Sequence, residues 1–166
     1  MDDIEYPLTG IDFLKGSMQD WITIAGIVIE GHRVAGQPSN VYPYSALEKQ
    51  KPYFKERGLD LDIYFNGTLN VSIAPSQFKM ISPEFSFLNV AWTELHPPEH
   101  FSFSRCKIGF RGRVSEGVVY YPHPETKIRH HQDPAVLEVM SEYIPGISYG
   151  DLVQLFLKLD EILIIK

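Results

Sequence analysis

Short runs of β-branched and aromatic residues, separated by turn-forming residues, recur along most of this chain of 166 residues. The clearest runs cover residues 21–30, 68–73, 101–110 and 152–159. Runs of this length and composition are typical of β-strands. The regular alternation of strands with longer helices that marks a doubly wound sheet is missing. The sequence therefore predicts a mostly β fold, with a single closed β-barrel and short inserted helices.

The second half of the chain adds two strands, a tight turn and an apolar tail. Residues 85–92 and 114–121 have the composition of strands, and the Arg-Gly-Arg sequence at 111–113 predicts a hairpin turn. The apolar residues 161–165 at the end of the sequence are expected either to extend the strand 152–159 or to pair elsewhere.

Helix signals are few and short. Ser45 followed three residues later by Glu48 forms a capping box, which predicts a helix start. Pro52 disfavours a long helix but is accepted at a first helical position. We therefore expect two helical pieces, near 46–50 and 52–57.

A further helix is expected after Asp133, which is followed by a proline. Asp at the N-cap and Pro at the first helical position are a common helix start. The spacing of the apolar residues then predicts a helix over 134–142 with three residues on one face: Val136, Leu137 and Met140.

Composition excludes several classes of protein. Asp and Glu outnumber Lys and Arg by 21 to 15, which argues against a general nucleic-acid binder. One cysteine makes neither an internal disulfide nor a Cys-rich zinc site. No apolar run approaches the roughly 20 residues that span a bilayer. We expect a soluble, cytoplasmic domain over 21–166, preceded by an acidic extension over 1–20.

The densest chemical signal is the sequence Asn-Gly-Thr-Leu-Asn at 66–70. Because side chains alternate along a strand, Thr68 and Asn70 share one face, next to the turn glycine Gly67. A hydroxyl and an amide oxygen suit Mg²⁺ that already carries phosphate oxygens, and backbone N–H groups near Gly67 suit phosphate. The alternative is an ordinary turn that leads into a strand with a solvated polar face.

Over residues 21–158 the chain resembles the archaeal CTP-dependent riboflavin kinases, with motifs in the same order and at similar spacing. Gly-Thr-Leu-Asn at 67–70 is the specific motif, and the other segments gain weight from their order. These segments are Gly26–Gly31, Pro52–Leu59, Glu116–Pro122, Thr126 with His130 or His131, Leu137–Met140, which matches a helix of that family, and Ser148–Val153.

The resemblance implies a cradle-loop barrel and a phosphotransferase site. In that family the threonine and asparagine of the motif hold magnesium and the nucleotide phosphates, roles that fall here on Thr68 and Asn70. For the part of the site that binds flavin, the resemblance implies Thr126 as a cofactor-binding residue and His131 and Glu138 as catalytic candidates. The expected co-substrate is CTP or another nucleotide, and the acceptor is a ribityl hydroxyl of flavin or another polyol.

The loop at 31–40 departs from the family pattern, which is a dense glycine loop. It keeps Gly31 and Gly36, and it contains an inserted Pro38. Gly31, Arg33 and Gly36 remain candidates for holding an anionic ligand. The altered loop favours a second hypothesis, a non-catalytic or regulatory binding domain on the same barrel. Either hypothesis predicts a phosphorylated small molecule, a nucleotide or a flavin as partner.

Histidines and carboxylates in the expected loops support a third hypothesis, a hydrolase or carbohydrate-modifying enzyme. Solvated or supporting roles are the commoner alternative for such residues, because they show no fixed-spacing metal motif. The residues concerned are His96, Glu99, His100, His123, His130, His131 and Asp133.

The basic residues of 105–113 also carry a prediction. Arg105, Lys107, Arg111 and Arg113 would form one stripe if 105–113 were a single strand, either as a solvated face or as a phosphate contact. Cys106 would then face the core as an inert residue, along with other apolar side chains of that strand. Asp151, after Gly150, is more simply explained as shaping a turn than as a functional carboxylate.

Overall fold

The structure is a computed structural model, and it describes residues 21–30, 46–127 and 133–166. Most of these residues belong to β-strands, as the sequence predicts. The elements are β1 Trp21–Ile29, α2 Ala46–Glu56, β2 Leu69–Ser72, β3 Gln77–Met80, β4 Phe85–Val90, β5 Glu99–Phe110, β6 Arg113–Pro122, β7 Val136–Ser141, β8 Leu152–Lys158 and β9 Ile162–Ile165.

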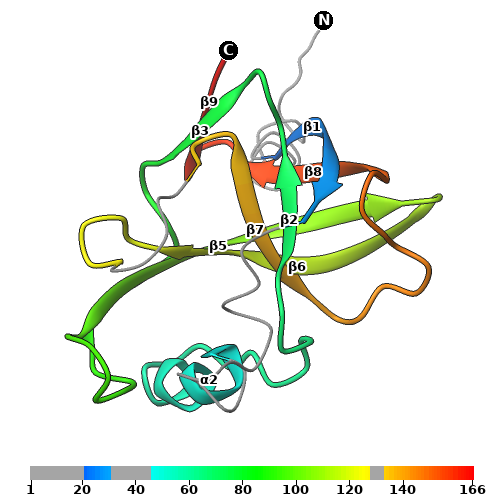
Figure 1. The fold of residues 1–166 in the computed structure, drawn as a ribbon. Coiled ribbons are helices and arrows are strands. Elements are labelled where there is room, and N and C mark those ends of the chain that lie inside the picture. Colours follow the sequence, from blue (N-terminus) through cyan, green and yellow to red (C-terminus); the bar gives the residue numbers. More distant parts are fainter. Residues whose placement is uncertain (1–20, 31–45, 128–132) are drawn as a thin grey trace, which may run out of the picture.

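Six antiparallel strands close into a barrel (Figure 1). The strands follow one another in the order β5, β6, β7, β2, β1 and β8, and β8 pairs back onto β5 over Cys106–Gly109. The first half of β5 instead pairs with β4, so one strand serves the barrel and an extension of its sheet. Within the described residues, no helix is long and apolar enough to cross a membrane.

Two buried clusters stabilise this arrangement. The barrel cluster fills the inside of the barrel with apolar side chains such as Val71, Ile108 and Leu155. The helix cluster lies between α2 and the outer part of the sheet, where the Phe54 ring makes edge contacts with Phe101 and Phe103 at 5.0 and 4.9 Å. Burial of large aromatic rings contributes strongly to stability, so this packing anchors α2 to the sheet.

The helix predicted over 134–142 is wrong, because Val136–Ser141 forms strand β7 between β2 and β6. The N-cap signal produces a turn: Asp133 Oδ1 accepts a hydrogen bond from the Ala135 N–H at 2.9 Å, and the Val136 N–H bonds to the Asp133 carbonyl. Pairing with β2 on one side and β6 on the other outweighs the helix signal, because it satisfies the backbone N–H and C=O groups of this segment.

The prediction of two helical pieces is also wrong, because α2 runs from Ala46 to Glu56 with Pro52 inside it. Leu47 and Phe54 are buried on one side of this helix. Their packing on the sheet maintains a helix that a proline would destabilise in isolation.

The predicted hairpin turn between β5 and β6 is confirmed. Arg111 and Gly112 have φ values of 51° and 78°, the conformation of the two-residue turn that suits twisted hairpins. The turn ends β5 at Phe110, so the basic residues of 105–113 do not form one stripe. Arg105 bonds to Glu84 at 3.1 Å, and Lys107 lies over the Trp21 ring.

The apolar tail forms β9 and pairs with β3, a strand that the sequence did not predict. Met80 lies opposite Ile162, and Phe78 lies opposite Ile164. Phe78 and Ile162 are buried in the barrel cluster. The pair therefore covers one part of the barrel with apolar side chains from two distant segments.

Candidate functional site

The structure brings Thr68, Asn70 and Glu138 together where β2 pairs with β7. Asn70 lies directly opposite Glu138 in the strand register, and the Thr68 hydroxyl donates a hydrogen bond to Glu138 Oε1 at 3.1 Å. Two elements that are distant in sequence thus present a carboxylate, a hydroxyl and an amide close together. We call Thr68, Asn70, Lys127 and Glu138 the β2–β7 site.

Lys127 completes this site, and it belongs to the basic group at 127–129 where the sequence allows an anionic ligand to be held. Its Nζ lies 3.8 Å from Glu138 Oε2, and the two side chains are 20% and 13% exposed. A partly buried ion pair is screened less by water and salt than an exposed one. Lys127 directly follows Thr126, a predicted cofactor-binding residue, and this position in the sequence could have indicated a site role for Lys127.

Thr126 belongs to the turn that positions Lys127. Its hydroxyl accepts a hydrogen bond from the His100 N–H at 2.9 Å, and the N–H groups of Thr126 and Lys127 both bond to the His123 carbonyl. The predicted cofactor-binding residue therefore lies beside the site, and its hydroxyl already supports the turn.

The remaining predicted residues divide into two groups. Gly67 precedes Thr68 directly and is half-buried. Gly31, Arg33, Gly36, His130 and His131 lie outside the described residues. Ile29, the last residue of β1, lies opposite Asn70.

Glu138 lies on strand β7, which corrects the helix that the sequence predicted for it. On a strand, its side chain shares a face with the facing positions of both neighbouring strands. These positions are Asn70 on β2 and Tyr120 on β6. The strand thus places the carboxylate across from Asn70, within reach of both Thr68 and Lys127.

The donor set fits a hard cation such as Mg²⁺ better than a softer metal. A hydroxyl, an amide oxygen and one carboxylate supply oxygen ligands, and Mg²⁺ commonly takes the rest from water and phosphate. No group of three or more His, Cys, Asp or Glu side chains that would hold a metal occurs in the described part of the chain. Two residues before Thr68, the buried Asn66 Oδ1 has no hydrogen-bond partner.

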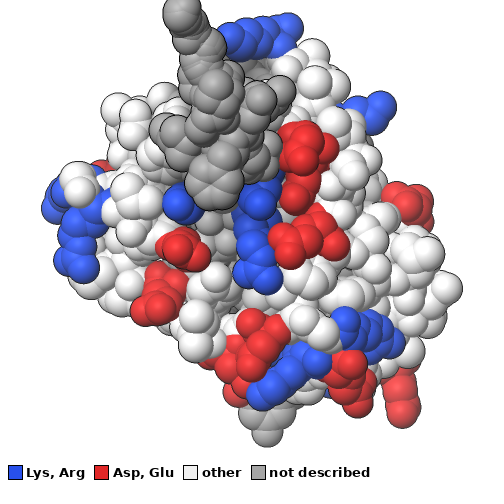
Figure 2. All heavy atoms as spheres, turned by 180° about the vertical axis from the view of Figure 1, so that it is seen from behind, with Lys and Arg blue, Asp and Glu red and all other residues white. Residues whose placement is uncertain are grey.

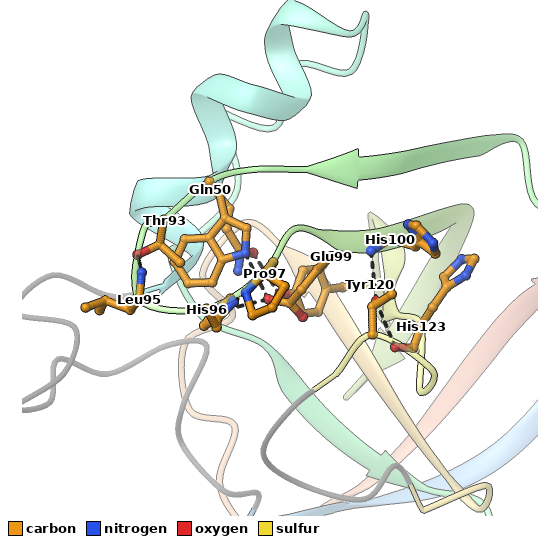
Figure 3. Close-up of polar contacts among 11 residues, drawn as sticks. Gln50, Thr93, Leu95, His96, Pro97, Glu99, His100, Tyr120 and His123 are labelled. Atoms are coloured by element: carbon orange, nitrogen blue, oxygen red, sulfur yellow. Dashed lines mark hydrogen bonds and ion pairs between the residues drawn. The ribbon is translucent and has the colours of Figure 1, made fainter.

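The histidines near β5 make polar contacts with neighbouring residues and are partly buried (Figure 3). Glu99 and His100 belong to β5 itself, which corrects the loop expected there. Glu99 Oε2 accepts a hydrogen bond from the Trp92 indole N–H at 2.9 Å and lies 3.6 Å from His96 Nε2. Burial raises the pKa of Glu99, while the Trp92 bond and His96 oppose that shift.

Ser102, His123 and Glu125 have the atom pairing of a serine-hydrolase triad. Ser102 Oγ and His123 Nε2 are 2.6 Å apart, and His123 Nδ1 lies 3.2 Å from Glu125 Oε2. However, Ser102 is 1% exposed, and its hydroxyl also contacts Ser86 at 2.8 Å. A nucleophile must reach its substrate, so this geometry serves to join β4, β5 and the turn after β6.

Cys106 lies in the barrel cluster, as the sequence predicts. Burial raises the pKa of its thiol to about 12. The reactive thiolate is therefore scarce at neutral pH, and Cys106 is a core residue.

Charges of both signs alternate over the face opposite to that of Figure 1 (Figure 2). Lys and Arg side chains on this face lie next to Asp and Glu, and no continuous basic band crosses it. Comparison with known proteins adds no family, because no family model and no curated protein matches this chain.

Proposed function

We propose that this chain binds a magnesium-complexed nucleotide at the β2–β7 site and transfers its terminal phosphoryl group to a hydroxyl of a flavin or another polyol. The observation that carries the proposal is the Thr68–Glu138 hydrogen bond, with Asn70 opposite Glu138. It joins the motif that resembles the riboflavin kinases to a carboxylate that the same resemblance selected, 70 residues away.

Each side chain of the site has a role that suits its chemistry. Thr68 and Asn70 would hold the cation, whose chemistry is to neutralise phosphate oxygens in the transition state. The Lys127 ammonium is a point charge suited to a phosphate group. Glu138 would accept the proton from the polyol hydroxyl while that oxygen attacks the terminal phosphorus and the bond to the leaving oxygen breaks.

Positioning accounts for most of the catalysis in such a reaction, since the protein performs little covalent chemistry. The pairing of β2 with β7 fixes the separation of Asn70 from Glu138. Side chains on paired strands are held more rigidly than side chains on loops, so the Asn70–Glu138 part of the site is preorganised.

The test is an assay of full-length protein with CTP or ATP, Mg²⁺ and riboflavin, followed by chromatographic detection of FMN. We expect FMN to form, and we expect Thr68→Ala and Asn70→Ala each to abolish its formation. The matched control is Ser72→Ala, which alters the next position on the same face of β2 and should retain activity. If no nucleoside triphosphate is consumed with any of the polyol acceptors, the proposal of phosphoryl transfer is contradicted.

A second candidate is a non-catalytic domain that binds a nucleotide or flavin at the same site. The altered glycines at 31–40 favour it, because a backbone that approaches phosphate closely usually needs glycine. A thermal-shift screen of nucleotides, riboflavin and FMN, with and without Mg²⁺, distinguishes the two. Stabilisation that Asn70→Ala removes, without turnover, supports the binding domain.

A further inference from the structure

The barrel wall formed by β1 and β8, which lie side by side in Figure 1, is apolar on both of its sides. Val28 and Leu155 point inward and are buried in the barrel cluster. Because side chains alternate along a strand, Ile27 and Leu152, which lie opposite each other, point outward. Strands that are apolar on both sides are typical of sheets that are covered on both sides. We call the outward positions of Trp21–Ile27 and Leu152–Lys158 the β1–β8 face.

Apolar side chains of the β1–β8 face are exposed to solvent. Leu152 and Ile27 are 68% and 47% exposed. The next strand of the barrel, β2, instead places the polar Ser72 and Asn70 outward, opposite Ile27 and Ile29. Exposed apolar side chains gathered in one place are typical of interaction surfaces. The apolar surface therefore ends at β2, beside the β2–β7 site.

The backbone of β8, in the middle of this face, is already paired on both sides. β8 pairs with β1 over Leu152–Lys158 and with β5 over Gln154–Leu157. A partner that lies across β8 therefore contacts side chains and must satisfy its own backbone hydrogen bonds, as an α-helix does.

The size of the face suits one helix. Neighbouring strands lie about 4.8 Å apart and rise about 3.3 Å per residue, so β1, β8 and β5 offer a surface of roughly 15 by 20 Å. An α-helix is about 10 Å wide and rises about 1.5 Å per residue, so a helix of about 13 residues covers it. A second copy of this chain would cover roughly 300 Å² here, well below the roughly 800 Å² per partner of a stable interface.

Positive charge lies at the Trp21 end of the β1–β8 face. The Nζ atoms of Lys107, on β5, and Lys158 lie 5.2 and 5.4 Å from the centre of the Trp21 ring. Lys158 lies directly opposite Trp21 in the register. Tryptophan is among the residues that contribute most to binding at interfaces, so this end provides an anchor with a defined charge.

The carboxylates of neighbouring strands do not pair with these lysines. β1 and β8 contain no Asp or Glu. Glu116 lies opposite Lys107 in the β5–β6 register, and Glu84 bonds to Arg105 of β5 at 3.1 Å. Within the described residues, neither Lys107 nor Lys158 forms an ion pair. Lys158, which no carboxylate faces in its register with β1, is therefore the position where a partner's acidic side chain fits.

We propose that the β1–β8 face binds an amphipathic α-helix of another protein. The helix is about 13 residues long, lays an apolar stripe over Ile27 and Leu152, and places an acidic residue near Lys158. A helix accounts for the exposed apolar side chains, for the paired backbone of β8 and for the size of the face. The inference does not depend on phosphoryl transfer at the β2–β7 site.

The experiment is a selection from a phage-displayed library of 16-residue peptides on a helix-forming framework, with the full-length chain as target and Leu152→Asp as counter-target. We expect apolar residues at helical spacing and an acidic residue near one end. A synthetic copy should bind Leu152→Asp at least about tenfold more weakly. The matched control Leu88→Asp alters a leucine of β4 that is 60% exposed and should change the affinity by less than about twofold. No enrichment, or equal binding to Leu152→Asp, would overturn the proposal.

The charge at the Trp21 end gives a smaller effect. Lys158→Glu should weaken binding of the same peptide about threefold, and Lys79→Glu, which reverses an exposed charge on β3, should not. Tryptophan fluorescence reports the position without a variant. Trp21 should shift to shorter wavelength as the helix covers it, over a constant signal from Trp92, which is 3% exposed. An unchanged spectrum with the peptide bound would contradict the proposed position.

Hydrogen exchange distinguishes the other possible occupants. The Val28 N–H bonds to the Asp151 carbonyl on the β8 side, so the Thr23 and Ala25 amides point away from β8. New protection of these two amides would indicate an added strand at the edge of β1 and would overturn the proposal. A dimer by light scattering that the peptide dissociates, or binding of a peptide with the sequence of residues 1–20 to the same face, would assign the face to this chain itself and would also overturn it.

Discussion

The β2–β7 site and the pocket at the turn of the β5–β6 hairpin both contain charged side chains of both signs, but only the first holds them in close contact. At the β2–β7 site Glu138 is held by Thr68 at 3.1 Å and lies 3.8 Å from Lys127, and both charged side chains are mostly buried. In the pocket at the turn of the β5–β6 hairpin, Arg111 and Arg113 lie with Glu116 and Glu142, and neither arginine forms an ion pair with the described residues. The charged groups of the first region are preorganised, whereas those of the second are held less closely.

The largest effect is expected where the charges are already organised. Glu138→Gln should lower phosphoryl transfer by about 100-fold or more, because the amide no longer takes a proton. Glu142→Gln, on the exposed end of the same segment, is the matched control and should leave the rate unchanged. Steady-state kinetics of FMN formation measure both. Equal loss in the two variants would show that Glu138 has no special role.

A smaller, structural effect is expected at Gly117, the first residue of β6 in the register with β7. A Cβ at Gly117 would lie 2.3 Å from the Met140 carbonyl oxygen, so Gly117→Ala must push β7 away from β6. We expect a loss of roughly 2–4 kcal/mol in the free energy of unfolding, the range for severe backbone or packing clashes.

Gly109 on β5 provides the control for this change. Its nearest contact for an added Cβ is a carbon of the Phe156 ring at 3.4 Å, which is ordinary van der Waals contact. Gly109→Ala should therefore cost much less in urea unfolding than Gly117→Ala. Similar losses in both variants would show that the β6–β7 contact is not the sensitive one.

Glu99 tests how burial affects a carboxylate away from both regions. Burial raises its pKa above the ordinary 4.5, against the opposing Trp92 bond and His96. The folded state therefore binds this proton more tightly than the unfolded state does. That contribution to stability is complete below pH 4.5 and is lost as the pH rises through the raised pKa.

Glu99→Gln, which does not ionise, should flatten this part of the pH dependence and keep the acceptor for Trp92. The measurement is the free energy of unfolding in urea at several pH values between 4 and 8. Parallel curves for the two proteins would contradict the assignment.

The smallest effect is expected at the turn of the hairpin. Arg111→Asn should raise the free energy of unfolding by roughly 0.5–1 kcal/mol, because asparagine accepts a positive φ more readily than arginine. Arg113→Asn, on the extended strand, should bring no such gain.

The sequence predicted those elements whose signals are local. Strands with β-branched residues and the Arg111–Gly112 turn follow from patterns within a few residues, and both occur as expected. The helix over 134–142 failed because Asp133 and Pro134 cap a turn equally well, and the choice depended on β2 and β6 as neighbours.

The site was predictable in part for a related reason. Thr68 and Asn70 are two residues apart, so a strand periodicity places them together. The approach of Glu138 and Lys127 depends on the pairing of β2 with β7 and on the turn after β6. The separate roles of Arg105 and Arg111 became clear only when the turn divided the expected basic stripe.

Strand β5 links the two buried clusters, since Phe101 and Phe103 belong to the helix cluster and Cys106 and Ile108 to the barrel cluster. If the packing of one cluster is lost, its half of β5 is no longer held, and the other cluster packs on the same strand. The two clusters should therefore unfold in a single cooperative transition. Cys106 sits at that junction with its thiol shielded. The rate at which a thiol reagent modifies Cys106 therefore reports the rate of global unfolding, and its measurement requires no added label.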